Sequence, residues 1–337
     1  MESRSDFSLK SLNTFDVEAR ARRYVRFDEE KEISEFLGVQ YFEGERLLVL
    51  GGGSNLLFVD DFDGIVLHPV LKGIDVLNAD ERYIRVRAMA GENWDELVAH
   101  AVASGWGGIE NLSLIPGSVG ASAVQNIGAY GVEVKDVIDS VEAIDIHSHE
   151  KIVFPAEACG FGYRTSHFKG LWTGRHIITA VVFRFCRQPR FVLDYPEVRE
   201  QVDALGPVNL DTLRQAIIAI RRAKLPDPAD LGNAGSFFKN PVVEPETLHR
   251  LQARFADLPR YPQPDGRVKL SAGWMIDRCG WKGRQIGRAG VHDRQALVLV
   301  NLGGATGREI LDLSERVRRS VNETFDVNLE REVKVVP

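Results

Sequence analysis

The sequence has no long hydrophobic run, no excess of basic residues and few cysteines, and each absence excludes a class of protein. No apolar stretch approaches the roughly 20 residues of a membrane span, and residues 1–6 lack the basic and apolar regions of a signal peptide. Lysine and arginine number 42 against 48 aspartates and glutamates, so the net charge of −6 leaves no electrostatic footprint for nucleic acid. We therefore expect a cytoplasmic protein without membrane insertion or nucleic-acid binding.

Metal sites and disulfides find equally little support. Cys159, Cys186 and Cys279 are far apart and odd in number, and they form no Cys-x-x-Cys pair. The 8 histidines show no His-x-x-x-His spacing, and no carboxylate cluster indicates metal ligands. A Gly-x-Ser-x-Gly elbow and the Rossmann spacing Gly-x-Gly-x-x-Gly before a helix are also absent. We expect no metal, and a hydrolase with a serine nucleophile is a poor alternative.

Glycine, in contrast, is abundant and is concentrated in two stretches. Residues 115–131 contain four glycines and the run of small residues Ala121, Ser122 and Ala123, and a short apolar strand over 47–50 leads directly into Gly-Gly-Gly-Ser-Asn at 51–55. Backbone without side-chain bulk can lie against a flat or anionic ligand, and its N–H groups can converge on phosphate oxygens. Either stretch alone could merely turn the chain. Two in one half favour a ligand with a long diphosphate body, and a dinucleotide such as FAD fits.

Hydrophobic periodicity indicates strands and helices in both halves. Residues 81–90 alternate, with Ile84, Val86 and Ala88 on one face, and Asn93 is placed to cap the helix that follows. Lys224 to Pro228 ends an amphipathic helix, because the residue before a proline disfavours helical dihedrals, and we expect the domain boundary there. The expected strands cover 23–27, 64–68, 74–77, 81–90, 141–146, 152–154, 177–185, 296–301 and 329–336, and the expected helices 28–37, 94–102, 211–223, 246–255, 272–279 and 306–325.

Motifs spread over nearly the whole chain resemble one family, the UDP-N-acetylenolpyruvoylglucosamine reductases (the MurB family). They occur in the family's order, from about Asn13 to the C-terminus, and together they are much more specific than any one alone. They are Leu-Gly-Gly-Gly-Ser-Asn at 50–55, Ile-Pro-Gly-Ser-Val-Gly at 115–120, Gln-Asn-Ile-Gly-Ala-Tyr-Gly at 125–131, Gly-Tyr-Arg-Thr-Ser at 162–166, Gly-Asn-Ala-Gly-Ser-Phe-Phe-Lys-Asn-Pro at 232–241 and Leu-Glu-Arg-Glu-Val at 329–333.

The resemblance implies an α+β fold. It predicts an FAD-binding domain over 1–225, made of two mixed α/β subdomains (roughly 1–70 and 71–225) similar to the vanillyl-alcohol-oxidase type, and a substrate-binding domain over 226–337. The implied activity is the reduction of UDP-N-acetylglucosamine enolpyruvate to UDP-N-acetylmuramate in peptidoglycan synthesis. Non-covalent FAD is the implied cofactor, NADPH the hydride donor, and the UDP-sugar and NADPH the small-molecule partners of a monomer.

Three residues carry the chemistry in this resemblance. Ser236 matches the proton donor to the substrate's C2, although a serine after a glycine is more often part of a turn. Arg164 matches a residue beside the substrate carboxylate, which a guanidinium can bind through two hydrogen bonds. Glu332 matches a residue that stabilises the enolic intermediate with Arg164, although from the residues alone an exposed carboxylate on an edge strand is the better interpretation. Glu330, two residues away, could be mistaken for it.

The remaining matches divide between cofactor and substrate. For substrate, lysines could pair with a diphosphate and tyrosines could cover a uridine or close a lid, while ordinary packing and solvated charge remain the alternatives. The cofactor-binding residues implied are Gly51, Gly52, Gly53, Ser54, Asn55, Pro116, Gly117, Ser118, Gly120, Ala121, Gln125, Asn126 and Gly128. The substrate-binding residues implied are Tyr163, Tyr195, Lys224, Asn240, Tyr261, Lys269 and Gln295.

Two other functions remain as alternatives. One is an FAD-dependent oxidase of similar architecture, which often tethers its flavin through His or Cys; neither glycine stretch contains those residues. The other is a nucleotide-binding protein without catalytic activity, against which the joint presence of Arg164, Ser236 and Glu332 argues.

Overall fold

The computed structural model describes residues 1–39, 42 and 44–337, which form two compact units. The first unit comprises residues 1–7, 21–53 and 63–223, and the second comprises residues 8–20, 54–62 and 224–337. Two short segments of the N-terminal half, 8–20 and 54–62, therefore belong with the C-terminal third. Within the described residues no helix is long and apolar enough to cross a membrane.

The first unit contains a five-stranded sheet in the order β11-β10-β12-β7-β6 and a four-stranded sheet in the order β1-β2-β5-β3. Their strands are β1 (Glu2–Ser8), β2 (Arg20–Phe27), β3 (Leu47–Val49), β5 (Phe62–Pro69), β6 (Ile74–Ala79), β7 (Tyr83–Met89), β10 (Ile138–Asp145), β11 (Lys151–Pro155) and β12 (His176–Cys186), and β8 (Gly128–Ala129) pairs with β9 (Val132–Glu133). The helices are α1 (Glu30–Val39), α2 (Trp94–Ala103), α3 (Val119–Val124), α4 (Pro196–Leu205) and α5 (Leu210–Lys224).

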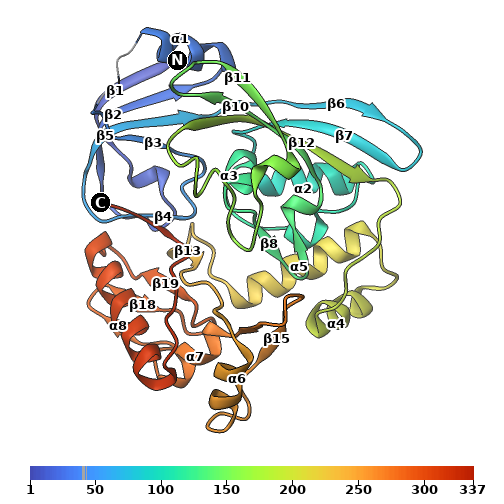
Figure 1. Ribbon diagram of the computed structural model, residues 1–337, viewed down its shortest axis with the longest axis vertical. Helices are drawn as coiled ribbons and strands as arrows, with labels where there is room; N and C mark the ends of the chain where they lie inside the picture. Colours follow the sequence, from blue (N-terminus) through green and yellow to red (C-terminus); the bar gives the residue numbers. More distant parts are fainter. Residues whose placement is uncertain (40–41, 43) are drawn as a thin grey trace. The chain divides into compact units, whose positions relative to one another are not determined.

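The main core of the first unit lies between the five-stranded sheet and α2 and α3, which cover one of its faces (Figure 1). The alternation predicted over 81–90 is confirmed, because Ile84, Val86 and Ala88 of β7 are buried in this core. The predicted cap is confirmed too: the Asn93 side chain accepts a hydrogen bond from the Glu96 N–H at the start of α2. The sheet and these two helices thus form two packed layers, and the helical layer carries the glycine-rich stretch of residues 115–131.

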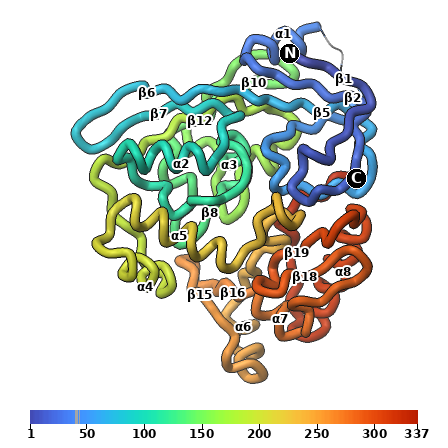
Figure 2. Tube along the Cα trace, turned by 180° about the vertical axis from the view of Figure 1, so that it is seen from behind, coloured from blue at the N-terminus to red at the C-terminus, as the bar shows by residue number. Residues whose placement is uncertain are grey.

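The second unit contains a four-stranded sheet in the order β13-β19-β18-β17, and Figure 2 shows α8 beside β18 and β19. The predicted strand over 329–336 is shorter, since only Lys334–Val336 form β20, which pairs in parallel with β4. The strands are β4 (Leu56–Phe58), β13 (Gly232–Ser236), β14 (Val242–Val243), β15 (Arg260–Pro262), β16 (Val268–Leu270), β17 (Gln285–Ile286), β18 (Ala289–Val291), β19 (Val298–Asn301) and β20, and the helices are α6 (Pro245–Gln252), α7 (Ala272–Arg278) and α8 (Gly307–Phe325).

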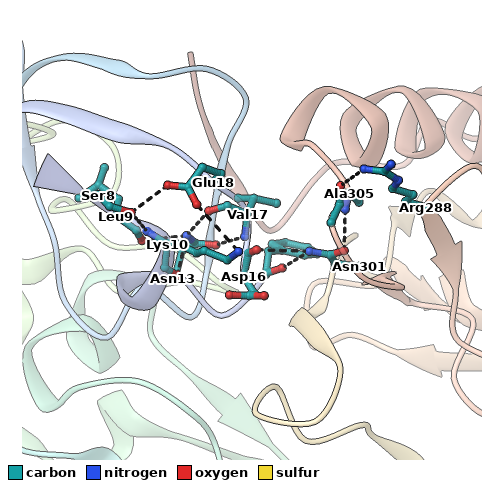
Figure 3. Close-up of polar contacts among 12 residues, drawn as sticks. Ser8, Leu9, Lys10, Asn13, Asp16, Val17, Glu18, Arg288, Asn301 and Ala305 are labelled. Atoms are coloured by element: carbon teal, nitrogen blue, oxygen red, sulfur yellow. Dashed lines mark hydrogen bonds and ion pairs between the residues drawn. The ribbon is translucent and has the colours of Figure 1, made fainter. Parts of the chain in front are cut away.

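Buried asparagines hold the early segment 8–20 in the second unit. The Asn13 amide donates to the carbonyls of Leu9 and Val17 at 2.9 and 3.0 Å, and the Asn301 amide at the end of β19 donates to the Phe15 carbonyl at 2.8 Å. Figure 3 shows both amides among these backbone groups. Each satisfies buried backbone that would otherwise lose hydrogen bonds on leaving water.

Asp145, at the end of β10, makes the stability of the first unit depend on pH. Its buried carboxylate accepts hydrogen bonds from Arg175 at 2.8 Å and from the N–H groups of His147 and Ser148 at 2.8 and 3.0 Å. Burial raises the pKa of Asp145, but these hydrogen bonds outweigh it and lower the pKa from 3.8 to about 2. A carboxyl with a lowered native pKa stabilises the fold above the pKa of the unfolded chain, and this contribution disappears as the pH falls from about 4 to about 2.

We expect Asp145→Asn to lower the free energy of unfolding by about 2 kcal/mol at pH 7, and by clearly less near pH 2, where about half of the wild-type carboxylates are themselves protonated. Urea denaturation at the two pH values measures the difference. Asp312→Asn, at an exposed position of α8, is the matched control and should change neither value. An equal loss at both pH values would show that the carboxylate charge is not the source of the stabilisation.

Candidate functional site

The two glycine-rich stretches meet in the first unit, and they do so because they lack side chains. A Cβ added to Gly52 would lie 2.8 Å from the Gly117 Cα and 3.3 Å from the Ser118 N. At Gly51 an added Cβ would lie 2.8 Å from the Ser118 Oγ. Atoms this close would clash, so only glycine lets the two backbones approach to this distance. The structure thus joins the two stretches that the sequence marks as a ligand cradle.

The second stretch is fixed to the chain just before α2. The N–H groups of Val119 and Gly120 donate to the carbonyls of Glu92 and Ala90, both at 2.9 Å. Residues 119–124 form the short helix α3, with the Ser118 side chain accepting at its start. A Cβ on Gly120 would lie 2.8 Å from the Ala90 Cβ. A glycine at 120 is therefore needed for packing against Ala90 inside the protein. A glycine in such a loop suggests, in contrast, a close approach to a ligand.

Arg164 lies in a tight turn of the same unit, with its backbone in the left-handed region at φ 55°. Gly162 and Thr165 close the turn by exchanging backbone hydrogen bonds at 3.0 and 3.2 Å. The Arg164 guanidinium donates to the Gly128 carbonyl and lies 5.4 Å from the centre of the Tyr163 ring. A Cβ on Gly128 would come within 2.8 Å of the Arg164 Nη1. Gly128 thus makes room for the guanidinium, and three predicted residues, Gly128, Tyr163 and Arg164, lie together.

The two predicted amides at 125 and 126 differ in their surroundings. Gln125 ends α3, and its backbone N–H bonds to the Ala123 carbonyl. The Asn126 side chain is fully buried, and its amide donates to the Gly162 carbonyl at 2.9 Å and to the Glu133 carboxylate at 3.2 Å. Both of its side-chain donors therefore serve the protein itself.

Tyr195 precedes α4, a helix that the proline-punctuated pattern from Phe191 did not predict. Its ring meets the Tyr130 ring edge to face, with centroids 5.8 Å apart, and both rings pack on a small hydrophobic cluster of α4 and α5. The buried Asn111 amide, which sequence reasoning missed, donates to the carbonyls of Tyr130 and Val192 at 3.0 Å each. Tyr195 thus belongs to a satellite cluster beside the main core.

Arg221 is a second residue that the sequence did not single out. It lies on α5 near Tyr130 and Asp95, and its Nε is buried without a hydrogen-bond partner. Burial lowers the pKa of this guanidinium, the charge of Arg164 lowers it further, and Tyr130 and Asp95 oppose the shift. Two cations in one part of the unit attract anions. The Arg-Arg pair at 221–222 did not indicate a functional residue in the sequence, because a cation near the end of an amphipathic helix is usually solvated.

Ser236 ends β13 in the second unit, in a turn that Asn233 holds. The buried Asn233 side chain accepts from the Gly235 N–H at 2.9 Å and donates to the Leu231 carbonyl at 2.8 Å. Gly235 has φ 68°, a left-handed conformation that glycine adopts without strain. Ser236 pairs with Val298 of β19, whose N–H donates to the Gln295 carbonyl at 3.0 Å. The predicted residue Gln295 thus lies on the turn that leads into the partner strand of Ser236.

Glu332 lies beside this turn. Its N–H donates to the carbonyl of Phe237, the residue after Ser236, at 2.9 Å. Its own carbonyl accepts from the Asn55 amide at 3.2 Å, and the Lys334 N–H donates to the Asn55 carbonyl at 3.0 Å. Asn55 of the first glycine stretch therefore belongs, with Ser54, to the second unit and holds the backbone of Glu332. The fold of the second unit thus brings Ser236, Glu332 and Asn55 together, although Asn55 and Glu332 are 277 residues apart in the sequence.

Glu330 and Glu332 are distinguished by their partners. The Glu330 side chain is largely exposed and accepts from the Lys239 Nζ at 2.6 Å. An ion pair with a largely exposed carboxylate contributes little to stability. The Glu330 backbone carbonyl accepts from the Lys239 N–H at 2.8 Å, whereas the backbone of Glu332 bonds to Phe237 and to Asn55.

Three predicted substrate residues gather around β16. Lys269 pairs with Tyr261 of β15 and with Val242 of β14, and its Nζ lies 5.9 Å from the centre of the Tyr261 ring. The Asn240 Oδ1 accepts from the Ala272 N–H at 2.9 Å, at the start of α7. Lys224 is the last residue of α5.

Among the described residues no three His, Cys, Asp or Glu side chains converge as metal ligands.

Comparison with known proteins finds similar chains along the whole length. Residues 227–336 match the model for the C-terminal domain of UDP-N-acetylenolpyruvoylglucosamine reductase, and residues 21–149 match that of an FAD binding domain. The chain is 49% identical to the UDP-N-acetylenolpyruvoylglucosamine reductase of Chromobacterium violaceum over 336 residues, 98% of each chain. It is 48% identical to that of Burkholderia mallei over 331 residues, 97% of this chain and 95% of the relative. The solved reductase of Thermus caldophilus is 26% identical, with a TM-score of 0.67, over 100% of this chain and 98% of that one.

Proposed function

The chain belongs to the UDP-N-acetylenolpyruvoylglucosamine reductase family, and on this premise we propose that Arg164, Ser236 and Glu332 carry its reaction. It is an FAD-dependent oxidoreductase that reduces UDP-N-acetylglucosamine enolpyruvate to UDP-N-acetylmuramate with NADPH. The observation that carries this function is the match of nearly the whole chain to reductases at 48–49% identity. The predicted family, α+β fold and activity are confirmed, and neither the oxidase nor the inactive protein finds support.

The residues of the first unit fit a dinucleotide. Gly51 and Gly52 approach Gly117 and Ser118 so closely that any Cβ would fill the space between the two backbones. We propose that the two stretches hold FAD through Gly51, Gly52, Gly53, Ser54, Asn55, Pro116, Gly117, Ser118, Gly120, Ala121, Gln125 and Gly128. Asn126, which was also predicted to bind the cofactor, is not included in this proposal, because its side-chain donors and its Oδ1 are all bonded within the protein. When bound, FAD supplies the hydride that NADPH has given it. For the Asn126 side chain, the contacts within the protein favour an indirect role.

The protein's own groups then have distinct tasks. The Arg164 guanidinium, already oriented by the Gly128 carbonyl and the Tyr163 ring, binds the substrate carboxylate and stabilises the charge that develops on it. Glu332 acts with Arg164 in stabilising the enolic form. Ser236 donates the proton to C2. The 2.9 Å hydrogen bond from the Glu332 N–H to the Phe237 carbonyl supports this assignment, because it fixes the backbones of Ser236 and Glu332 relative to each other.

The substrate residues, the domains and the setting of the protein are also proposals. Tyr261, Lys269 and Asn240 around β16, with Lys224, Gln295, Tyr163 and Tyr195, are proposed to bind the UDP-sugar, and the cation beside the Tyr261 ring supports a nucleotide there. An FAD-binding domain over 1–225 and a substrate-binding domain over 226–337 are supported by the two family-model matches. We propose a monomer in the cytoplasm.

A spectrum of the purified protein tests the flavoenzyme assignment. We expect a yellow protein whose flavin absorbance is released by denaturation, since neither glycine stretch offers a His or Cys for a covalent link. Anaerobic NADPH should bleach this absorbance, and the enolpyruvyl UDP-sugar should restore it. A colourless protein that cannot be reconstituted with FAD would contradict the function.

A further inference from the structure

The Asn126 amide lies at the junction between the glycine-rich stretch and the Arg164 turn. Its side chain is fully buried, and both side-chain donors are used, one on the Gly162 carbonyl at 2.9 Å and one on Glu133 at 3.2 Å. The Asn126 Oδ1 accepts from the Lys135 N–H at 3.1 Å. A primary amide has only two N–H bonds, so no donor is left for a cofactor.

The backbone of Asn126 is in the left-handed region at φ 47°, as is that of Arg164 at φ 55°. Such conformations cost free energy and persist where the surrounding structure fixes them. Asparagine tolerates this region better than most residues, because its short side chain finds local partners. The left-handed turn at 126 directs the amide to the Gly162 carbonyl, and this hydrogen bond anchors the Arg164 turn. The Ser166 hydroxyl, which donates to the Val124 carbonyl at 2.5 Å, adds a contact just after the turn.

We propose that Asn126 is a positioning residue for Arg164. The Gly162 carbonyl accepts from both the Asn126 amide and the Thr165 N–H, so the amide holds the closed end of the four-residue turn from which the guanidinium projects. The inference rests on the role proposed above for Arg164. Asn126 touches neither substrate nor cofactor in this account and acts through Arg164 alone.

Two variants distinguish the effect of the Asn126 side-chain amide from that of its left-handed backbone. Asn126→Asp keeps the shape but replaces both donors by an acceptor that faces Glu133, and Asn126→Gly keeps the left-handed backbone but removes the side chain. The role proposed for Arg164 concerns the enolpyruvyl substrate, so reduction of the flavin by NADPH should stay near its normal rate. Reoxidation by the enolpyruvyl substrate should slow by about 10- to 100-fold, as a displaced catalytic group does. Hydrogen exchange of residues 162–166 should become faster in both variants.

A double-mutant cycle with Arg164→Ala tests whether the amide acts through the guanidinium. In the Arg164→Ala protein, adding Asn126→Asp should change reoxidation by no more than about twofold, because the group that it positions is gone. Asn13→Asp is the matched control: it removes another buried amide, one that bonds the Leu9 and Val17 carbonyls, and it should lower stability without changing the ratio of the two half-reaction rates.

Four results would overturn the proposal: independent losses in the double mutant, equal slowing of both half-reactions, normal reoxidation in both Asn126 variants, or failure of both variants to fold, which would mark a purely structural residue. The role of Arg164 is judged separately. If Arg164→Ala alone leaves reoxidation unchanged, the proposed catalytic assignment is wrong. If Arg164→Ala slows reoxidation but neither Asn126 variant does, Arg164 keeps its role and Asn126 loses the one inferred here.

Discussion

Replacing Ser236 by alanine should leave reduction of the bound flavin by NADPH near its normal rate and slow reoxidation by the enolpyruvyl substrate by about two to four decades. The loss is that expected for a missing general acid. Only the second half-reaction needs a proton at C2, and the neighbouring backbone should keep its place because the Asn233 and Phe237 contacts do not involve the serine hydroxyl. Stopped-flow absorbance of the flavin measures both halves in one sample.

Ser236→Cys provides the matched control, since a thiol keeps a transferable proton at nearly the same place, and it should lose less than the alanine variant. Equal slowing of both half-reactions in Ser236→Ala would mean that the serine shapes the site instead of donating a proton. If neither half-reaction slows, the proton has another source.

Gly52→Val should weaken FAD binding by about 10- to 100-fold, the second large effect that we expect. The new Cβ would lie 2.8 Å from the Gly117 Cα and 3.1 Å from the Gly117 carbonyl carbon, so the two glycine stretches must separate. Backbone of this kind cannot move aside as the end of a flexible side chain can, and overpacking costs about 1–3 kcal/mol. Equilibrium titration of the apoprotein with FAD, followed by flavin fluorescence, gives the change in Kd.

Gly38→Val, on α1 of the same unit, is the control for the added bulk, because its Cβ would meet nothing closer than 3.9 Å. It should bind FAD like the wild type. Normal FAD affinity in Gly52→Val would show that the approach of the two stretches is not needed for the cofactor, and the proposed cradle would be wrong.

The elements that the sequence predicts well are those whose signal is local. The alternation of β7 and the amphipathic face of α5 depend only on which residues recur at a fixed spacing, and both elements formed within a few residues of the expected bounds. The strand expected over 329–336 formed only at its C-terminal end, for the opposite reason. Residues 334–336 alone find a partner, β4, which lies far back in the sequence, and no local pattern reports where that pairing ends.

The residues of the candidate site show the same difference between local sequence patterns and long-range contacts. Motif order was enough to identify the family, and it singled out Ser236 and Glu332 as candidate catalytic residues, but it could not say what each amide does. Asn55 and Asn126 both stand in glycine-rich motifs, and both were predicted to bind cofactor. The structure finds the Asn55 amide on the Glu332 carbonyl and the Asn126 amide on the Gly162 carbonyl, 277 and 36 residues away. Such contacts depend on tertiary structure, which one sequence does not encode locally.

The assignment of residues 8–20 and 54–62 to the second unit has a consequence for the order in which the protein is made. These segments are synthesised long before their partners, because Asn301, the donor to the Phe15 carbonyl, lies 286 residues after it, and β20, the parallel partner of β4, is farther still along the chain. Contacts at such sequence separation slow folding, because a long loop must close before they form. The second unit therefore cannot complete its fold until residues 334–336 have been synthesised. Until then, the exposed edge of β4 is a surface on which a chaperone can act and aggregation can begin.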